Sequence, residues 1–314
     1  LFLVFRRPDI TRRVFNEIKK VRPEQLFIGC DGPSDSVPGE AKKVQSVKEI
    51  FKKEIDWPCE VKTFFREKNE GSRVAETEAI NWFFENVEEG IILEDDCLPS
   101  QSFFYFCKEL LKYYRNDARI MMISGNNFHF GRKYGRYSYF FSRHVLTWGW
   151  ATWRRAWSYN DMNLENLIDF KKEQKIKDIN GNYLWKRNYL ANLNKVYNNR
   201  LDAWDFPWSY TNFCQNGLVC IPNVNLVSNI GFGADAVNHT GRPAKIQNIP
   251  LDEIKFPLFH PQFLIPSKCA DDFLIRNAYG FRLDKQIVGY FIVLAIRISK
   301  FLKLYNIIKR YILH

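Results

Sequence analysis

Three consecutive acids, Glu94-Asp95-Asp96, directly follow a short apolar run over residues 90–93. The run has the length and composition of a buried strand, and Pro99 and Ser100 mark its end. Open α/β sheets bind ligands at the carboxyl ends of their strands. Because adjacent like charges repel one another, the triplet indicates a hard divalent cation, Mn²⁺ or Mg²⁺, shared with a substrate diphosphate. The alternative is a solvated acidic turn.

A second pair of acids, Asp202 and Asp205, alternates with the aromatic residues Trp204, Phe206 and Trp208. Aromatic neighbours desolvate a carboxylate and raise its basicity, which suits a general base. We expect Asp205 to be that base, with Asp202 the second candidate. Asp202 could instead cap a helix.

The elements around these acids alternate between strand and helix signals over the first 130 residues. Strands separated by helices predict a mixed, mainly parallel sheet in an α/β fold, with helices on both faces. Later strand signals lie at 137–142 and 218–222, helices are expected within 161–200, and residues 227–240 read as loops. The expected early strands are 1–5, 25–30, 59–65, 91–93 and 120–123, and the expected early helices are 10–21, 44–54, 71–86 and 102–114.

The order of these motifs resembles that of GT-A-fold glycosyltransferases. The resemblance rests on Asp31-Gly32-Pro33, on Arg66 followed by Asn69-Glu70-Gly71, and on the strand ending in the acidic triplet. The triplet is similar to the DxD-type motif, in the EDD form of N-acetylglucosaminyltransferase-I-like enzymes. Segments 148–157 and 225–233 resemble bacterial sugar transferases of surface-polysaccharide loci, so the resemblance covers about residues 1–240.

The resemblance implies a metal-dependent glycosyltransferase of the hexosyl or N-acetylhexosaminyl class. Such an enzyme moves a sugar from a nucleotide-diphosphate donor to a hydroxyl of a glycan or lipid-linked acceptor, here by an inverting reaction with Asp205 as base; retention stays open. The resemblance implies that Asp96 and His239 contact the metal, and that Glu94 and Asp95 contact ribose, sugar or metal-bound water. It implies that Phe5 and Arg6 hold the base and that Asp31 contacts the nucleoside. Arg66 would contact the base or the phosphates. An ordinary turn or surface residue is the alternative for Arg6, Asp31 and Arg66, and a structural loop residue for His239.

Four tryptophans fall within residues 147–157. Sugar C–H faces stack on aromatic rings, so Trp148 and Trp150 are expected to be exposed as an acceptor platform; the alternative is a packed core. Arg154 and Arg155 in the same segment could meet phosphate or be solvated.

The 314 residues carry a net charge of +11, with no acid after Asp284 and six basic residues beyond it. These cations alternate with apolar residues, which favours an anionic membrane surface over nucleic acid as the partner. The uncharged stretch 286–296 is too short to span a bilayer, so residues 285–314 predict a basic helix lying in the membrane surface. A helix packed on the body is the alternative.

We therefore expect a nucleotide-sugar-binding half at 1–130, an acceptor-binding half at 131–260 and a C-terminal extension at 261–314. The seven cysteines are odd in number and lack CxxC spacing, which is typical of reduced thiols. A cytoplasmic protein, peripheral on the inner face of the cell membrane, follows from these patterns.

Two other functions compete with this one. A sugar nucleotidyltransferase needs a Gly-rich, Arg-containing loop after the first strand, which Phe5-Arg6-Arg7-Pro8-Asp9 does not supply. A catalytically inactive glycan- or membrane-binding module on the same scaffold is the other alternative, and the intact acidic triplet argues against it.

Overall fold

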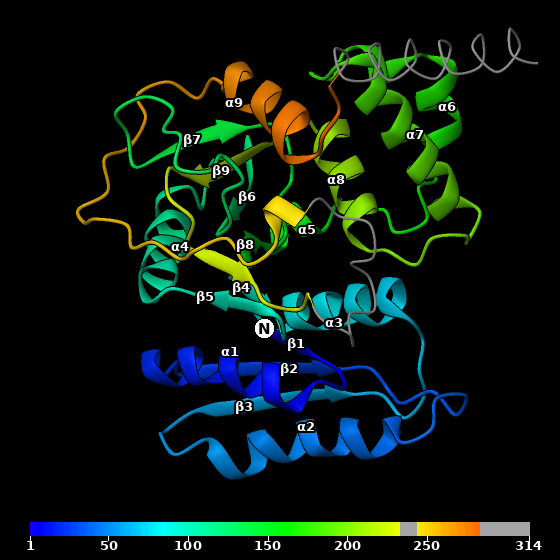
Figure 1. Cartoon of the computed structure of the whole chain (residues 1–314), viewed down its shortest axis with the longest axis vertical. Helices are drawn as coiled ribbons and strands as arrows, with labels where there is room; N and C mark the ends of the chain where they lie inside the picture. Colours follow the sequence, from blue (N-terminus) through cyan, green and yellow to red (C-terminus); the bar gives the residue numbers. More distant parts are fainter. Residues whose placement is uncertain (233–243, 283–314) are drawn as a thin grey trace, which may run out of the picture.

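The computed structural model describes residues 1–232 and 244–282, and a twisted sheet runs through its centre (Figure 1). Within these residues the sheet has eight strands in the order β3-β2-β1-β4-β8-β6-β9-β7. The strands are β1 (Phe2–Val4), β2 (Gln25–Cys30), β3 (Glu60–Phe65), β4 (Glu89–Glu94), β6 (Ile120–Ser124), β7 (Tyr139–Ser142), β8 (Trp150–Trp153) and β9 (Leu218–Pro222).

Most neighbouring strands of the sheet run parallel. β1 pairs in parallel with both β2 and β4, β2 with β3, and β6 with β9. β8 lies antiparallel between β4 and β6, and β7 is antiparallel to β9. This arrangement confirms the predicted mixed, mainly parallel α/β sheet.

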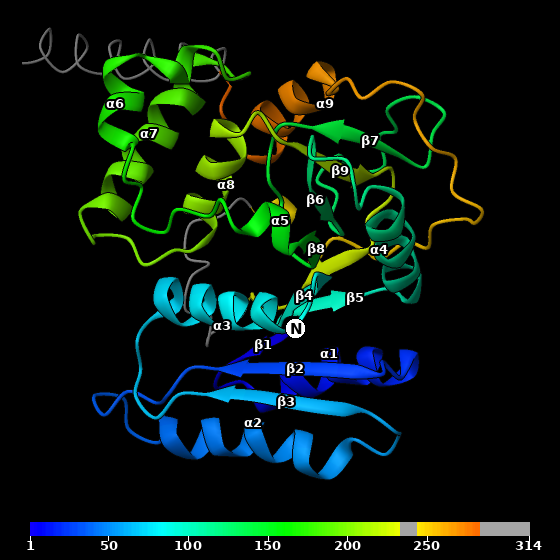
Figure 2. The ribbon, with the colours of Figure 1, turned by 180° about the vertical axis from the view of Figure 1, so that it is seen from behind.

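Helices cover both faces of this sheet. α1 packs against α2 and α4, whereas α3 packs over β2 and against α5 (Figures 1 and 2). The α-helices are α1 (Pro8–Val21), α2 (Glu40–Glu54), α3 (Ser72–Asn86), α4 (Gln101–Tyr113), α5 (Arg154–Trp157), α6 (Leu167–Lys172), α7 (Tyr183–Tyr197), α8 (Asp205–Cys214) and α9 (Lys268–Phe273). Short 3₁₀ turns, η1 (Lys175–Lys177) and η2 (Ala244–Ile246), and a π-helical turn, η3 (Leu274–Ala278), complete the described elements.

A two-stranded antiparallel ribbon, β5 (Cys97–Pro99) with β10 (Val227–Asn229), lies beside the acidic triplet. In its register Asn229 pairs with Cys97, the residue after the triplet. Residues 227–229 were expected in a loop, and the ribbon corrects that expectation. The ribbon brings a segment 130 residues away in sequence against the triplet.

The tryptophan-rich segment forms β8 and α5, and its tryptophan side chains pack in the core and do not form an exposed surface. β8 is an inner strand covered on both faces, so all four of its residues are buried. Trp150 stacks on Trp204 with ring centroids 5.5 Å apart, and Trp157 and Trp208 complete the cluster. The indoles therefore join the sheet to the segment that begins α8.

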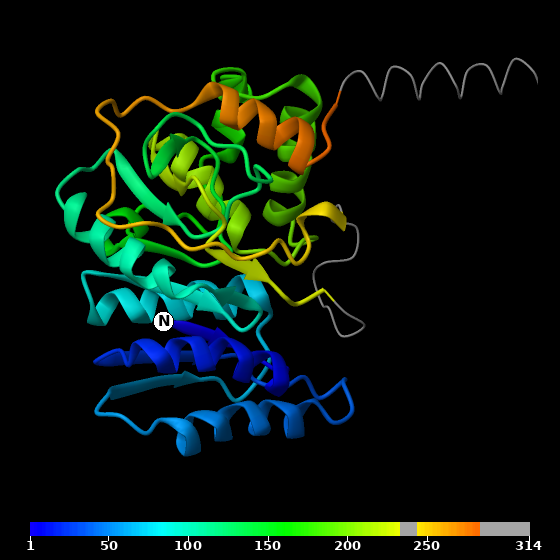
Figure 3. The ribbon, with the colours of Figure 1, turned by 60° about the vertical axis from the view of Figure 1, so that its left-hand side comes forward.

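A smaller helical cluster lies beside the sheet, drawn in green at the upper right of Figure 1. α6, η1, α7 and α8 enclose a second hydrophobic core around Leu167, Trp185, Leu193 and Tyr210. The segment from η2 to α9 runs along the outside of the molecule (Figure 3). It is tied down where the N–H of Ile254 donates to Ser102 and the N–H of Phe259 donates to Ser138.

The sheet combines strands from both predicted halves of the chain, since β1–β4 and β6 come from residues 1–130 and β7–β9 from 131–260.

All seven cysteines are free, and four of them are buried. Across the described ranges, no helix combines the length and apolar character that crossing a membrane requires. The predicted membrane-surface helix at 285–314 and His239 lie outside those ranges.

Candidate functional site

The carboxyl ends of three neighbouring parallel strands meet at one edge of the sheet. β1 ends before Phe5, β2 before Asp31, and β4 at Glu94, which pairs with Leu3 of β1. A cleft of about 400 Å³ opens here, closed on its far side by the start of α3 and by residues 201–206. Of the predicted site residues it is lined by Phe5, Arg6, Asp31, Glu94, Asp95, Asp96, Trp148, Asp202 and Asp205.

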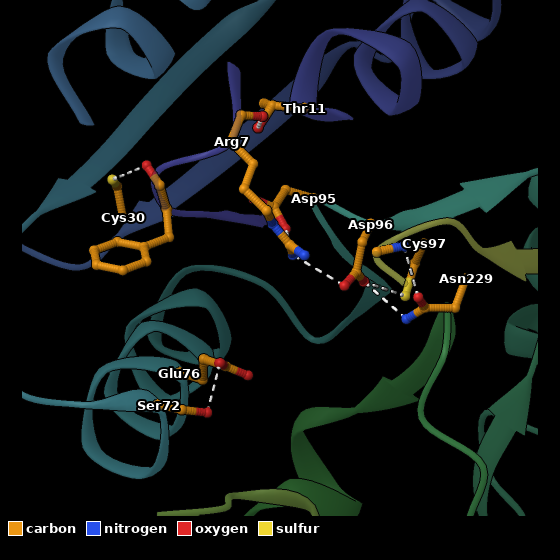
Figure 4. Close-up of polar contacts among 11 residues, drawn as sticks. Arg7, Thr11, Cys30, Ser72, Glu76, Asp95, Asp96, Cys97 and Asn229 are labelled. Carbon is orange, nitrogen blue, oxygen red and sulfur yellow. Dashed lines mark hydrogen bonds and ion pairs between the residues drawn. The ribbon is translucent and has the colours of Figure 1, made fainter. Parts of the chain in front are cut away.

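Arg7 forms the central ion pairs of the cleft, with both Asp95 and Asp96 (Figure 4). Its Nη2 donates to both carboxylates and lies 2.9 Å from Asp96 Oδ2. Burial lowers the pKa of Arg7, but the two carboxylates outweigh burial and raise that pKa above its ordinary value. No motif in the sequence indicated a contact between Arg7 and the acids, so its pairing with the triplet is a finding of the structure.

Asp96 is also held from the side of the ribbon. Asn229 Nδ2 donates to Asp96 Oδ1 at 3.0 Å, and the N–H of Gly231 donates to Asn229 Oδ1 at 2.9 Å. A Cβ at Gly231 would lie 2.2 Å from Asp96 Oδ2 and 2.8 Å from Arg7 Nη1. Only glycine allows the backbone to approach the acid this closely. Segment 225–233, which resembles bacterial sugar transferases, therefore contains a glycine that the packing against the triplet requires.

Glu94 and Glu76 add two more carboxyl groups to the cleft. Burial, followed by the charge of Glu76, raises the pKa of Glu94 well above its ordinary value. Burial also raises the pKa of Glu76 to about 8, with a contribution from Asp205, although Ser72 Oγ donates to its carboxylate at 2.8 Å. The protonated form of each group is therefore favoured in the folded chain when no added cation compensates the carboxylates.

Sequence reasoning missed Glu76. The signal that could have found it is its position four residues after Ser72 and between Ala75 and Ala79, the small residues with which it lines the cleft. Small side chains on one side of a helix let the helix approach a ligand site, and a carboxylate among them then faces the same space.

The two acids of the aromatic segment take different positions. Asp202 accepts the backbone N–H groups of Ser72 and Arg73, both at 2.8 Å, and so caps the start of α3. Asp205 is the first residue of α8, is half-buried, and lines the cleft. The structure thus supports the helix-cap alternative for Asp202, at a helix distant in sequence, and leaves Asp205 as the candidate base.

Asp31 joins the end of β2 to the loop before α3. Its carboxylate accepts the N–H groups of Glu70 and Gly71, both at 3.1 Å, and the amide of Asn69 at 3.0 Å. Burial is the largest influence and raises the pKa of Asp31, against the effect of these hydrogen bonds. Asp31 lines the cleft, and its contact with a nucleoside stays a prediction.

The remaining predicted arginines face in different directions. Arg6 lines the cleft, pairs with Glu40, and lies over the Phe5 ring at 5.5 Å. Arg66 pairs with Glu78 of α3 and does not line the cleft. A direct contact of Arg66 with a base or phosphate therefore requires a different side-chain position.

Trp150 is fully buried away from the cleft, so its expected exposure is wrong. The physical reason is its place on an inner strand, where its indole packs against Trp204. Trp148 is also buried, at 5% exposure, although it lines the cleft. A contact between Trp148 and an acceptor stays a prediction.

Arg154 and Arg155 bind backbone carbonyl groups. Arg154 donates to Val87 at 3.2 Å, and Arg155 donates to Tyr114 and Ile120, both at 3.0 Å. Neither arginine lines the cleft. The structure therefore supports neither of the two expected roles, contact with phosphate or simple solvation.

The oxygen-rich cleft fits a hard cation in its chemistry. Arg7 pairs with Asp95 and Asp96. Among the described residues, the cleft is lined by seven carboxyl groups, Asp31, Glu76, Glu94, Asp95, Asp96, Asp202 and Asp205. Over residues 1–232 and 244–282, no three His, Cys, Asp or Glu side chains form a ready-made metal cage. Magnesium is usually bound by one or two carboxylates and completed by substrate phosphates and water, which is the arrangement these residues allow.

Comparisons with known proteins give a likeness in structure alone. No protein-family model matches the chain, and no curated protein matches it in sequence. The crystal structure of S. aureus TarS 1-349 matches with a TM-score of 0.38 and 11% identity, over 71% of this chain and 57% of that chain. A crystal structure of an active-site mutant of LgtC matches with a TM-score of 0.36 and 11% identity, over 80% of this chain and 85% of that chain.

The present chain spans little more than half the length of the TarS chain. At these TM-scores and identities, neither match assigns an activity or a residue role to this chain.

Proposed function

We propose that this chain is a glycosyltransferase that uses a nucleotide-diphosphate sugar and a divalent cation. The observation that carries the proposal is the cleft at the carboxyl ends of β1, β2 and β4, where the acidic triplet faces Asp31 and Asp205. Ligands of open α/β sheets bind at this edge. The GT-A resemblance of the sequence supports the same reading.

The donor would lie across this edge. Phe5, Arg6 and Asp31 line the end of the cleft formed by β1 and β2, which suits a base and ribose, and Glu94 and Asp95 would contact the ribose, the sugar or metal-bound water. Asp96, fixed by Arg7 and Asn229, would hold Mn²⁺ or Mg²⁺. The bound cation would supply Lewis-acid neutralisation of the departing diphosphate.

Asp205 would act as the general base. It would accept the proton of the acceptor hydroxyl as that oxygen forms a bond to the anomeric carbon and the bond from that carbon to the diphosphate oxygen breaks. Attack from the face opposite the diphosphate gives inversion. Its place at the start of α8, across the cleft from the triplet, fits an acceptor that enters between the two.

A panel of nucleotide sugars tests this function through slow donor hydrolysis, measured as release of free nucleotide. We expect one nucleotide class to be hydrolysed in the presence of Mn²⁺ and not after chelation. A second assay supplies a hexose-1-phosphate and a nucleoside triphosphate in place of the nucleotide sugar. We expect no release of pyrophosphate, and its release would identify a nucleotidyltransferase. Absence of hydrolysis and of nucleotide binding across the panel would reject the proposal.

A further inference from the structure

A second cavity, of about 820 Å³, lies outside the acidic cleft, between η1, the start of α7, the end of α8 and the start of α9. We call it the basic pocket, because five of its lining side chains are cationic and two are acidic. The cations are Arg143, Lys175, Lys177, Lys186 and Lys268, and the acids are Asp178 and Asp271. None of these residues lines the acidic cleft.

The acids of the basic pocket do not neutralise its lysines. Asp271 is buried and accepts Ser142 Oγ at 2.6 Å and the N–H of Arg143 at 3.3 Å. Lys177 has no ion pair among the described residues, and Lys186 Nζ donates only to the backbone carbonyl of Lys177, at 2.8 Å. Lys175 pairs with Glu173 at 3.4 Å and Lys268 pairs with Asp272 at 2.9 Å, and neither of these acids lines the pocket. Among the described residues, Lys177 and Lys186 therefore remain without a carboxylate partner.

The pocket also offers apolar walls and a free amide. Phe170, Ile179, Phe213 and Pro266 line it. The Nδ2 of Asn180, another lining residue, is buried and has no hydrogen-bond partner among residues 1–232 and 244–282. Buried amide donors are rarely left unpaired, so this position calls for an acceptor oxygen from a ligand or water.

One helix connects the basic pocket to the acidic cleft. α8 begins with Asp205 in the cleft and ends with Cys214 in the pocket, nine residues further along. At 1.5 Å per residue these ends lie roughly 14 Å apart. Figure 2 shows α8 between the sheet and the green helical cluster. A ligand that occupies both sites must be elongated.

We propose that the basic pocket binds the anionic part of a sugar-chain acceptor, one that carries carboxylate or phosphate groups, while its reacting hydroxyl lies at Asp205. Lysine ammonium groups bind such anions as point charges, and arginine binds them through paired donors. The apolar walls would pack against the C–H faces of the sugars. This inference rests on the proposed glycosyl transfer and names the class of its acceptor.

Calorimetric binding to the full chain tests the proposal without requiring transfer. The probes are tetragalacturonic acid (charged sugar), maltotetraose (neutral sugar) and inorganic pyrophosphate (charge without sugar). The pocket variant combines Lys177→Ala and Lys268→Ala, both exposed positions. The matched control combines Lys172→Ala and Lys195→Ala, exposed lysines of the same helical cluster that do not line the pocket.

We expect tetragalacturonic acid to bind the wild type and the control variant alike and the pocket variant about tenfold more weakly. Binding should weaken in 1 M salt, where the Debye length is about 3 Å, and maltotetraose should bind far more weakly. Three binding results would overturn the proposal: an equal loss of tetragalacturonic acid binding in the pocket and control variants, maltotetraose binding as tight as that of tetragalacturonic acid, or binding of pyrophosphate but not of the charged sugar. The absence of binding of any probe would also overturn it. Nucleotide binding, measured in parallel, reports on the cleft: its absence beside intact pocket binding would reject the donor assignment alone.

Discussion

Charge balance among single side chains decides what the acidic cleft can bind. Arg7 compensates Asp95 and Asp96. Burial, followed by the charges of neighbouring carboxylates, raises the pKa of both Glu76 and Glu94. A second cation would relieve this repulsion, since it favours the ionised carboxylates. This compensation is the role that we propose for the divalent cation.

Replacing Asp205 by Asn tests the base. The substitution keeps the size and position of the side chain but removes the proton acceptor, so the rate of transfer should fall by about 10²- to 10⁴-fold. Calorimetry should show unchanged binding of the nucleotide. Near-full transfer activity in Asp205→Asn would rule this residue out as the base.

Glu76 makes a pH prediction in the absence of divalent cations. Its pKa is raised from 4.5 to about 8 in the folded chain, so from about pH 5 to 8 the folded state holds a proton that the unfolded state has lost. Stability therefore falls as pH rises through this window. Glu76→Gln should flatten the decline, measured as the free energy of unfolding in urea at several pH values.

A Glu76→Gln variant whose unfolding free energy follows the same pH slope as the wild type would show that Glu76 is ionised in the folded chain. Glu85→Gln serves as a matched control on the same helix, because Glu85 is exposed and lies outside the cleft.

At the scale of elements, strand ends and helix starts form the site. The apolar runs before Asp31 and Glu94 predicted β2 and β4 correctly, because buried parallel strands read as continuous apolar sequence. The same reasoning placed the triplet at the carboxyl edge. Local sequence was sufficient here since each strand is specified by its own residues.

Pairings between distant segments could not be predicted in this way. β10 exists because residues 227–229 meet β5, and β8 is a strand because β4 and β6 flank it. Trp150 looked suited to a surface platform, and only its position on that inner strand shows it to be core. The contacts of Arg7 with Asp96 and of Asp202 with α3 likewise depend on tertiary structure.

The cap of α3 gives the prediction for this scale. Asp202→Ala leaves the N–H groups of Ser72 and Arg73 without their acceptor and should cost about 1 kcal/mol of stability, a fall in Tm of about 2 °C. Asp202→Asn keeps one acceptor oxygen of the two that Ser72 and Arg73 use, so it should lose less stability than Asp202→Ala.

Differential scanning calorimetry measures both variants. Equal Tm values for Asp202→Ala and the wild type would contradict the capping role. Loss of transfer in a folded Asp202→Asn that still binds nucleotide would instead make Asp202 the base.

The whole molecule separates its charges into two sites. The acidic cleft lies at the carboxyl edge of the sheet, and the basic pocket lies at the other end of α8, beside the smaller helical core. A donor with a cation suits the first, and an anionic chain suits the second. The net charge of +11 favours association with anionic partners in general.

Deleting residues 285–314 should release the protein from liposomes that contain anionic lipid. These residues carry six basic side chains and no acid, and each basic residue near an anionic surface contributes about 1 kcal/mol. Cosedimentation measures the bound fraction, with neutral liposomes as the control. Unchanged binding after the deletion would contradict a membrane-surface role for this segment.

The central claim concerns the acidic triplet, and calorimetric titration of UDP and GDP, each with and without Mn²⁺, tests it most directly. Asp96→Asn keeps the shape of the side chain but removes its charge, and Asp9→Asn is the matched control at an exposed position outside the cleft. We predict that one nucleotide binds the wild type and Asp9→Asn only when Mn²⁺ is present, and that Asp96→Asn loses this binding. Nucleotide binding that ignores both Mn²⁺ and the Asp96 substitution would contradict the account.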